Sequence, residues 1–420
     1  MNKAIFYAPC IPTNWEIIPN KYLFTPHSKK VGKEFENYNL LSLTKSGVIL
    51  KDIESNEGKL PVSFEGYQTV ESNDLIMCLF DLDVSAVFSG LSKYEGMITS
   101  AYDVFRVNSL KMLPKFADYW FENVFSRRSY SVYSKSLRHT IAFDSFKNIP
   151  TAVPPLDVQT KTVSFLNDKI EAINSLISNE TKQIEKLEEY KKAVITKAVT
   201  KGLDPNVKMK DSGVEWIGEI PEKWQINRIK YISFSNPDSL SDSESESLII
   251  NYVDIGSVSL ENGIERTETY SFEDAPSRAR RVLKKGDVII STVRTYLKAI
   301  AVVDRNGLIG STGFCVLRPI VNLIDSNFLG YYCKSNVFTD EISKRSFGIS
   351  YPAITSTQLI SLYLPFPPFK DQQHIAYYLN NVCGKINEII GIKKSKIEKL
   401  QAYKKSLIYE YVTGKKAVEA

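Results

Sequence analysis

The feature that most constrains this chain is an internal repeat. Residues 153–200 align without a gap to residues 366–413, at a constant offset of 213. Identical pairs include Pro154 and Pro367, Gln159 and Gln372, Leu166 and Leu379, Ile173 and Ile386, and Tyr190 and Tyr403. A tandem duplication of this length predicts two copies of one structural unit, so the fold has to accommodate both copies.

The segments that precede the two copies also resemble each other, but more loosely. The motif IPTNW at 11–15 recurs as IPEKW at 220–224, and NDLI at 73–76 recurs as GDVI at 286–289. The repeated segments at 153–200 and 366–413 match better than these preceding domains do. This difference indicates that the repeated segments share one task, while each domain meets a different target.

Both repeated segments are predicted to be long helices that form a coiled coil. Each begins after a Pro-Pro pair and contains no further proline, and its apolar residues alternate at spacings of three and four, which is a heptad seam. The seam residues expected to pair the helices are Leu166, Ile170, Ile173, Ile177, Ile184, Leu187, Leu379, Ile386, Ile390, Ile397 and Leu400. Phase and polar interruptions agree between the copies. Because a tandem repeat within one chain closes most simply around a pseudo-twofold axis, we expect the two helices to pack antiparallel.

The rest of the chain is predicted to form strand-rich domains. Short β-branched or apolar runs occur at 75–80, 248–253 and 286–291, and polar irregular stretches separate them. The predicted fold class is α+β: two mixed α/β domains in tandem, each followed by a long helix, with the helices forming an antiparallel coiled coil. The predicted boundaries are 1–151 and 203–365 for the domains, and 152–202 and 366–420 for the helices.

Composition limits the class of protein without naming a partner. The chain is 43% hydrophobic and 24% charged, with a net charge of +5. The surplus is local, since residues 366–420 hold ten Lys against five Asp or Glu. Charges interrupt the longer apolar stretches, so no membrane span is expected. Five scattered cysteines without a CxxC pair favour free thiols in a cytoplasmic protein.

Familiar catalytic motifs are absent from the sequence. No phosphate-binding GxxxxGK[ST] loop occurs, and His27, His139 and His374 have no neighbouring ligand at metal spacing. The Pro-Pro pairs follow Val153 and Phe366, which lack the polar side chain that adenine methyltransferases place before such a pair. The sequence therefore predicts no catalytic residue, no metal site and no cofactor in this chain.

Basic and aromatic residues in the domains are the candidates for DNA contact, although charge alone does not suggest DNA. Arginine suits such contacts because its planar donor fork matches guanine edges and phosphate oxygens. The candidates are Arg127, Arg128 and Arg138 in the first domain, and Arg278, Arg280, Arg281, Lys284, Arg294, Tyr296, Lys344 and Arg345 in the second. For any one of them, ordinary solvated charge is an equally good interpretation.

These features in combination resemble the specificity subunits of type I restriction-modification systems. The segment DSGVEWIGEIPEKW at 211–224 is similar to the motif that opens a variable domain in that family. The segment PFPPFKDQQHIAYYLN at 365–380 is similar to the motif that opens its conserved helix. The resemblance covers essentially the whole chain, although the first domain keeps only IPTNW of its opening motif.

The resemblance implies a function that the residues alone do not. Each domain would be a target-recognition domain that reads one half of a bipartite, asymmetric site in double-stranded DNA, and the helices would set the gap. Two methyltransferase subunits would dock on the helices, and restriction or translocase subunits would join them. S-adenosylmethionine, ATP and Mg²⁺ would be used by those partners, and this chain would be their non-catalytic subunit.

One other interpretation remains open, a structural coiled-coil scaffold that joins two protein-binding domains. It differs from the first interpretation in that it predicts no DNA binding alongside a co-expressed methyltransferase. A third interpretation, a target-recognition segment split from a fused restriction enzyme, would require methyltransferase motifs in the same chain, and none appear.

Overall fold

The chain forms two compact units. The computed structural model describes residues 11–45, 47–52, 63–82, 88–134, 139–348 and 350–418. The first unit comprises Met1–Glu180 with Ser395–Ala420, and the second comprises Thr181–Lys394. Each unit therefore combines one globular domain with part of each long helix. The predicted boundaries of the two domains and two helices along the sequence stay a prediction. The division into compact units instead falls within both long helices, after Glu180 and after Lys394.

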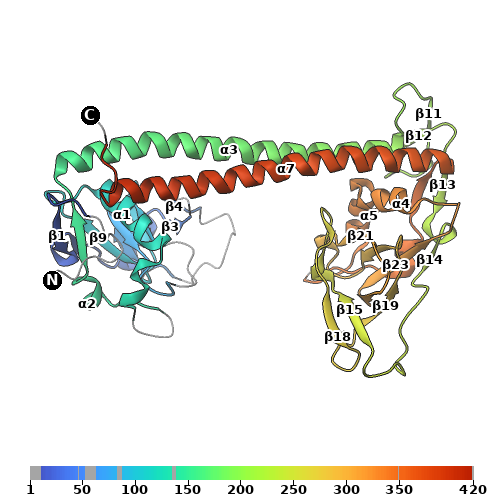
Figure 1. The fold of residues 1–420 in the computed structure, drawn as a ribbon, viewed down its shortest axis with the longest axis horizontal. Helices are drawn as coiled ribbons and strands as arrows, with labels where there is room; N and C mark the ends of the chain where they lie inside the picture. The colour runs from blue at the N-terminus through green and yellow to red at the C-terminus, as the bar shows by residue number, and fades with distance from the viewer. Residues whose placement is uncertain are drawn as a thin grey trace. The chain divides into compact units, whose positions relative to one another are not determined.

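The two repeated segments are continuous helices, α3 (Leu156–Lys201) and α7 (Phe369–Val412) (Figure 1). Each starts directly after its Pro-Pro pair, where proline's fixed φ and missing N–H cost nothing. Each ends near a glycine in the left-handed region, Gly202 with φ of 76° and Gly414 with φ of 72°, which caps the last turn. Within the described residues, neither these helices nor any other carries an apolar stretch able to cross a bilayer.

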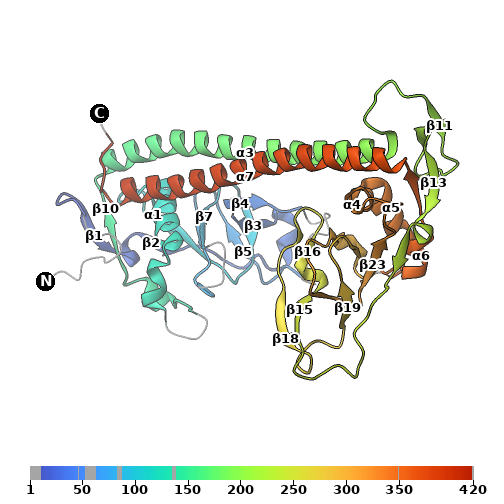
Figure 2. The same cartoon turned by 45° about the vertical axis from the view of Figure 1, so that its right-hand side comes forward.

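In each unit the segments of α3 and α7 lie side by side and run antiparallel, as predicted (Figures 1 and 2). In the first unit the rings of Phe165 and Tyr411 are 4.5 Å apart, and Lys396 Nζ lies 2.5 Å from Glu180 Oε1. In the second unit Lys191 Nζ donates to Asn387 Oδ1 at 2.7 Å. Residue numbers rise along one helix as they fall along the other.

The predicted seam residues are covered within this helix pair. Leu166, Ile170, Ile173, Ile184, Leu379, Ile386 and Ile390 are buried, and Ile177, Leu187, Ile397 and Leu400 are half-buried. Covered side chains hold the helices together. Any role of these residues in docking a partner subunit stays a prediction.

The first domain is built on short sheets. Its four-stranded sheet has the order β2 (Phe24–Pro26), β9 (Asp103–Val107), β6 (Leu75–Met77) and β7 (Ser89–Leu91). The paired strands around it are β1 (Glu16–Pro19) with β10 (Pro150–Val153), β3 (Leu41–Thr44) with β4 (Gly47–Leu50), and β5 (Gln68–Val70) with β8 (Gly96–Ile98). Two helices are α1 (Pro114–Ser126) and α2 (Phe143–Phe146).

The second domain repeats the same central sheet. Its order is β14 (Ser233–Ser235), β23 (Phe314–Pro319), β20 (Val288–Ser291) and β21 (Ile300–Val302), with the same antiparallel pairings. A further four-stranded sheet has the order β18 (Glu268–Ser271), β15 (Ile249–Val253), β22 (Leu308–Ser311) and β19 (Ala279–Leu283). The remaining strands are β11 (Met209–Asp211) with β12 (Glu219–Pro221), β13 (Gln225–Arg228) with β24 (Tyr363–Phe366), and β16 (Val258–Ser259) with β17 (Gly263–Ile264). Its helices are α4 (Ser326–Lys334), α5 (Asn336–Arg345) and α6 (Ser356–Ile360).

Short 3-10 turns connect several of these elements. They span Asn20–Tyr22, Gly32–Asn37, Ser129–Tyr133, Ile229–Tyr231, Ile255–Ser257 and Thr295–Leu297. The predicted strands at 75–80, 248–253 and 286–291 appear as β6, β15 and β20. Both β6 and β20 directly follow a repeated motif, Asn73-Asp74 in the first domain and Gly286-Asp287 in the second, which we call the Asp turn.

Each unit has a main hydrophobic core that includes side chains from both long helices. In the first, the aromatic residues of α1, among them Phe116 and Trp120, share one core with Leu166 of α3 and Leu407 of α7. In the second, Val199 of α3 and Leu379 of α7 enter the core of the second domain. The antiparallel pairing explains this, because it brings the last turns of α7 back to the first domain.

The start of each long helix is joined to its domain by the same contacts. Gln159 is fully buried; its Oε1 accepts from the Leu113 N–H at 2.7 Å, and its Nε2 donates to two backbone carbonyls. Gln372, 213 residues later, makes the equivalent three bonds around the Asp325 N–H. The repeat in sequence therefore corresponds to a repeated buried joint.

The repeated tryptophan motif covers the other helix ends. The C-terminal glycine of α3, Gly202, faces Trp224, whose ring would lie 3.3 Å from a Cβ added there. Gly414 at the end of α7 faces Trp15 and Pro12 even more closely, with 2.9 and 2.5 Å to an added Cβ. Glycine is required at both places by the positive φ and by these approaches.

Candidate nucleic-acid interface

A rigid loop between β20 and β21 stands out in the second unit. The backbones of Arg294 (φ 52°, ψ 50°) and Lys298 (φ 47°, ψ 41°) both adopt the left-handed conformation, which residues other than glycine rarely adopt. The Thr295 N–H donates to Pro352 O at 3.2 Å, and the Ile354 N–H donates to Thr292 O at 2.9 Å. These bonds join the loop, residues 292–299, to the described residues 346–348 and 350–354, and we call the two segments together the loop surface.

Aromatic side chains are exposed on the loop surface. Phe347 is 74% exposed, Tyr351 64% and Tyr296 57%. The guanidinium of Arg294 lies 5.0 Å from the Tyr351 ring centroid. Clustered exposed aromatic rings beside a cation are typical of a binding surface rather than of a solvated loop.

The loop surface contains only some of the predicted DNA-contact residues. Arg294 and Tyr296 lie on it. Lys344 and Arg345, at the end of α5, precede it directly in the chain, and Arg345 is paired with Glu341 at 2.6 Å. Phe347 and Tyr351 were not predicted. Their signal was the sequence SFGISY at 346–351, whose aromatic residues could equally have been core.

The predicted cluster on β19 does not form one exposed basic patch. Arg280 pairs with Asp242 at 3.3 Å and lies over the Phe272 ring, and Lys284 pairs with Asp238 at 3.1 Å. Arg281 is half-buried, and its Nε is buried without a hydrogen-bond partner. An acidic segment, 238–246, folds along the strand and offsets much of its charge.

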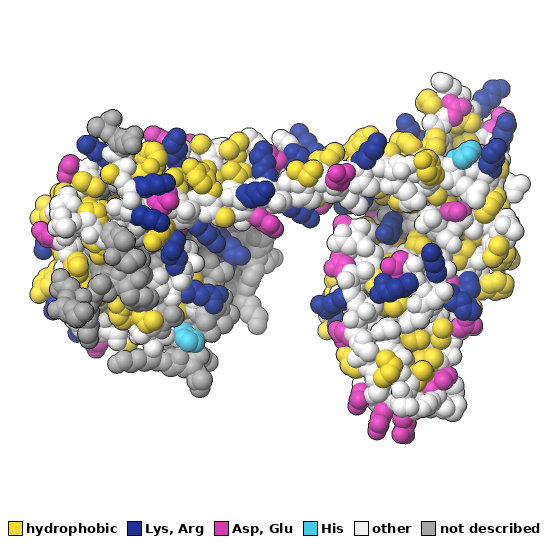
Figure 3. Space-filling model, viewed as in Figure 1, with side chains coloured by type: hydrophobic (Ala, Val, Ile, Leu, Met, Phe, Trp, Pro, Cys, Tyr) yellow, Lys and Arg dark blue, Asp and Glu magenta, His cyan; other side chains and the backbone are white. Residues whose placement is uncertain are grey.

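Arg278 differs from its neighbours because it directly precedes β19, at the end of the strand that is linked to the loop surface. The Arg278 carbonyl accepts from the Thr312 N–H at 2.8 Å. The residue after Thr312, Gly313, in turn accepts at its carbonyl from the Thr292 N–H of the loop at 2.8 Å. Arg278 is exposed. Acidic side chains instead gather around the end of the second unit that carries β15 and β18 (Figures 1 and 3).

In the first unit, one of the predicted DNA-contact residues already packs against another side chain of the unit. Arg127 follows α1, and its guanidinium lies 3.5 Å from the centroid of the Tyr409 ring on α7, so it packs the domain against the helix. Arg128 is exposed, with φ of 52°. Arg138 lies outside the described residues. For all eleven predicted residues, contact with DNA stays a prediction.

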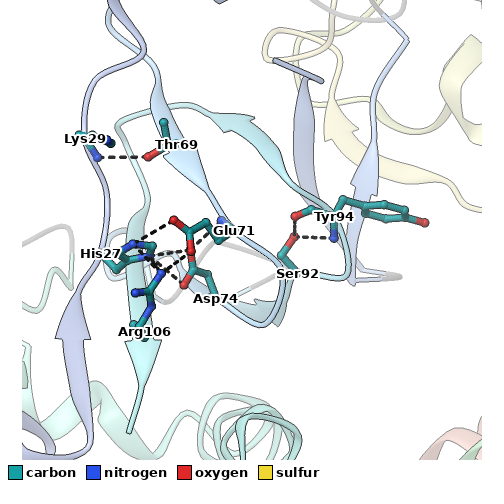
Figure 4. Close-up of polar contacts among 8 residues, drawn as sticks. All are labelled: His27, Lys29, Thr69, Glu71, Asp74, Ser92, Tyr94 and Arg106. Carbon is teal, nitrogen blue, oxygen red and sulfur yellow. Dashed lines mark hydrogen bonds and ion pairs between the residues drawn. The ribbon is translucent and has the colours of Figure 1, made fainter. Parts of the chain in front are cut away.

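A polar cluster occupies the Asp turn of the first domain (Figure 4). The Asp74 carboxylate lies 3.0 Å from His27 Nδ1 and accepts from the Glu71 N–H at 2.7 Å. Arg106 contacts both His27 Nε2, at 2.7 Å, and the Glu71 carboxylate. Burial raises the pKa of the Asp74 carboxyl, while the Glu71 and His27 hydrogen bonds oppose that rise.

The second domain closes the same turn without a histidine. Asp287 is buried, accepts from the Lys284 N–H at 2.8 Å and pairs with Arg318 at 2.8 Å. The hydrogen bonds that the Arg318 guanidinium donates to the Asp287 carboxylate raise the pKa of Arg318. Since both domains give the buried aspartate hydrogen-bond partners at the same turn, the cluster that contains His27 is part of the shared scaffold.

The comparisons with known proteins agree with this architecture. Residues 221–399 match the family model for the type I restriction modification DNA specificity domain. The specificity subunit of type I restriction enzyme MjaVIII from Methanocaldococcus jannaschii is 27% identical over 284 residues, which is 64% of this chain and 63% of that protein. The putative MjaX specificity subunit of the same organism is 28% identical over 276 residues, or 64% of this chain and 60% of that protein.

The chain spans less than two thirds of the length of these curated relatives. A solved chain from a study of complex assembly and conformational transition of the type I R-M system covers 96% of this chain, and 98% of its own length, at a TM-score of 0.69 and 15% identity. That likeness shows a common fold. The match of residues 221–399 shows that this part of the chain is a type I restriction modification DNA specificity domain, and the chain is similar to specificity subunits of type I restriction enzymes.

Proposed function

We propose that this chain selects the DNA sequence on which a type I restriction-modification complex acts. Each unit would read one half of a bipartite, asymmetric site. The observation that carries this proposal is the duplicated sheet and Asp turn, of which the second copy lies within the matched DNA specificity domain at 221–399. Two copies of one scaffold with different surface residues suit two different half-sites.

Catalysis would belong to partner subunits. Two methyltransferase subunits would bind S-adenosylmethionine and methylate adenine, and restriction or translocase subunits would use ATP and Mg²⁺. The complex would act in the cytoplasm, on genomic and incoming DNA. Selecting a sequence needs only donors, acceptors and shape on the protein side.

The helix pair offers one exposed surface in each unit where a methyltransferase would dock. Leu176 and Tyr403 are 46% and 55% exposed in the first unit, and Ile389 and Tyr190 are 43% and 57% exposed in the second. Each of the four residues directly precedes a position of the heptad seam: Leu176 and Ile389 precede Ile177 and Ile390, and Tyr190 and Tyr403 precede the polar seam positions Lys191 and Lys404. The offset of 213 relates Leu176 to Ile389 and Tyr190 to Tyr403, so the surfaces carry equivalent residues and fit two copies of one partner.

Native mass spectrometry of the chain with the methyltransferase of its system tests this docking. The wild-type chain should bind two methyltransferases. The double variant Leu176→Glu with Tyr403→Glu should bind one, because the charges disrupt only the surface of the first unit. Ser178→Glu, at an exposed position nearby on α3, is the matched control and should bind two.

DNA binding by the same complexes tests the function itself. Duplex DNA that carries the methylated motif should bind more tightly than a scrambled duplex, in a salt-dependent manner. A complex that assembles but shows no preference among duplexes would favour the coiled-coil scaffold instead.

A further inference from the structure

The second unit leaves few arginines available to read DNA. Six are engaged with side chains of the unit: Arg228 with Tyr363, Arg266 with Ser257, Arg280 with Asp242, Arg305 with Asp304, Arg318 with Asp287 and Arg345 with Glu341. Arg281 is half-buried. Among the described residues of this unit, Arg278 and Arg294 are the arginines that combine exposure with no hydrogen bond or ion pair from the side chain.

The surroundings of Arg294 favour recognition over simple charge. Its backbone is held in the left-handed conformation by bonds on both sides of the loop, and such strain persists where the surrounding structure over-determines it. The Tyr351 ring supports its guanidinium without using any of its N–H donors. A fork that is supported on one face and has free donors loses little entropy when it pairs with a base edge.

We infer that Arg294 reads a guanine in the half-site of the second unit, with Tyr351 as its positioning residue. The exposed guanidinium would donate to guanine O6 and N7, which is the commonest specific contact of arginine in the major groove. Arg278, at the neighbouring end of β19, contacts a phosphate of the same half-site. This inference rests on the proposed function and assigns its specificity to particular residues.

The test is modified-base sequencing of genomes from a host that expresses the chain with the methyltransferase of its system. Arg294→Gly removes the side chain and also relieves the left-handed backbone. Arg294→Gln keeps a long polar side chain but replaces the guanine-matching fork with an amide. In both variants one G·C pair of the second half-site should become degenerate, with the preference for guanine reduced about 5- to 150-fold. The other half-site should not change.

Four further variants distinguish base reading by Arg294 from its support by Tyr351 and from a general effect of charge. Tyr351→Ala should weaken the same guanine preference, and Tyr351→Phe, which keeps the ring, should retain it. Arg278→Ala should lower binding at every sequence and reduce the salt slope by about one unit, with the motif unchanged. Arg305→Ala, whose partner Asp304 is local and exposed, is the control and should change neither.

The possible outcomes are distinct. An unchanged motif in both Arg294 variants overturns the inference while leaving the proposed function intact. A uniform loss of methylation without degeneracy at one position also overturns it, because that is the behaviour of a phosphate contact. If the wild-type chain directs no methylated motif, the proposed function fails, and the inference fails with it.

Discussion

Replacing the buried glutamine at the start of each long helix should destabilise one unit and not the other. Gln159→Leu keeps most of the volume but removes three hydrogen bonds, which leaves the Leu113 N–H and the carbonyls of Lys111 and Pro154 unsatisfied in the interior. Gln372→Leu does the same to the Asp325 N–H and two carbonyls in the second unit.

The expected cost follows from these bonds. Each contributes about 0.5–1.5 kcal/mol net, and each buried group left unpaired costs roughly 1–3 kcal/mol. Some of these groups will be reached by water, so each variant should lose about 3–5 kcal/mol of unfolding free energy. For a unit of this size, the midpoint of its thermal transition should fall by roughly 6–20 °C.

Hydrogen exchange read by mass spectrometry locates the effect. Gln159→Leu should speed exchange in α1, at the start of α3 and at the end of α7, and leave the second domain protected. Gln372→Leu should act on α4 and the second domain. Gln373→Leu, the exposed neighbour, is the matched control and should stay within about 0.5 kcal/mol of wild type.

Two results would refute this reasoning. A cost below about 1 kcal/mol in both variants would mean that the glutamines are not buried joints. Equal loss of protection in both units from either variant would mean that the units do not unfold separately, and that the cores are not divided as described. If the sites are independent, the double variant should show the sum of the two costs.

Three smaller predictions follow from charged and capping residues. Burial lowers the pKa of Lys334 to about 8, so its charge destabilises the second unit as pH falls toward that value; Lys334→Met should melt higher than wild type at pH 7, with no difference above pH 10.5. Glu180, buried opposite Lys396, should be replaceable by leucine without loss of stability in a urea titration, because the Lys396 ammonium that it leaves behind is 54% exposed and stays solvated; marked destabilisation would contradict this. Gly202→Val should lower the thermal midpoint of the second unit by several degrees, because of its positive φ and Trp224; an unchanged midpoint would count against the cap.

The sequence predicted the elements that depend on local pattern. The constant offset located both helices, the Pro-Pro pairs located their starts, and the heptad phase identified which side chains would be covered. The antiparallel direction followed from the duplication. These features depend on spacing along the chain, which a single sequence displays.

The distribution of the two cores could not be predicted in the same way. A linear division assigns α3 and α7 to separate segments, whereas the pairing returns Leu407 to the core of the first domain and takes Val199 into that of the second. Contacts between residues hundreds of positions apart decide this, and composition or periodicity does not record them.

The candidate DNA surface shows the same limit. Sequence displays the arginines of β19 but not the acidic segment that folds onto Arg280 and Lys284. The stretch KRSF at 344–347 echoes RRSY at 127–130 in the first domain, yet Tyr130 is 1% exposed and Phe347 is 74% exposed. Exposure is a tertiary property, and it changes which residues are candidates for binding.

Exchange of one domain tests the central claim most directly, namely that each unit reads its own half of a bipartite DNA site. Residues 203–365 would be replaced by the corresponding domain of a specificity subunit with a different known motif, and the methylated motif would be read by modified-base sequencing. The predicted result is a hybrid motif in which one half is new while the other half and the gap are unchanged. A motif that changes in both halves, or in neither, would contradict the claim.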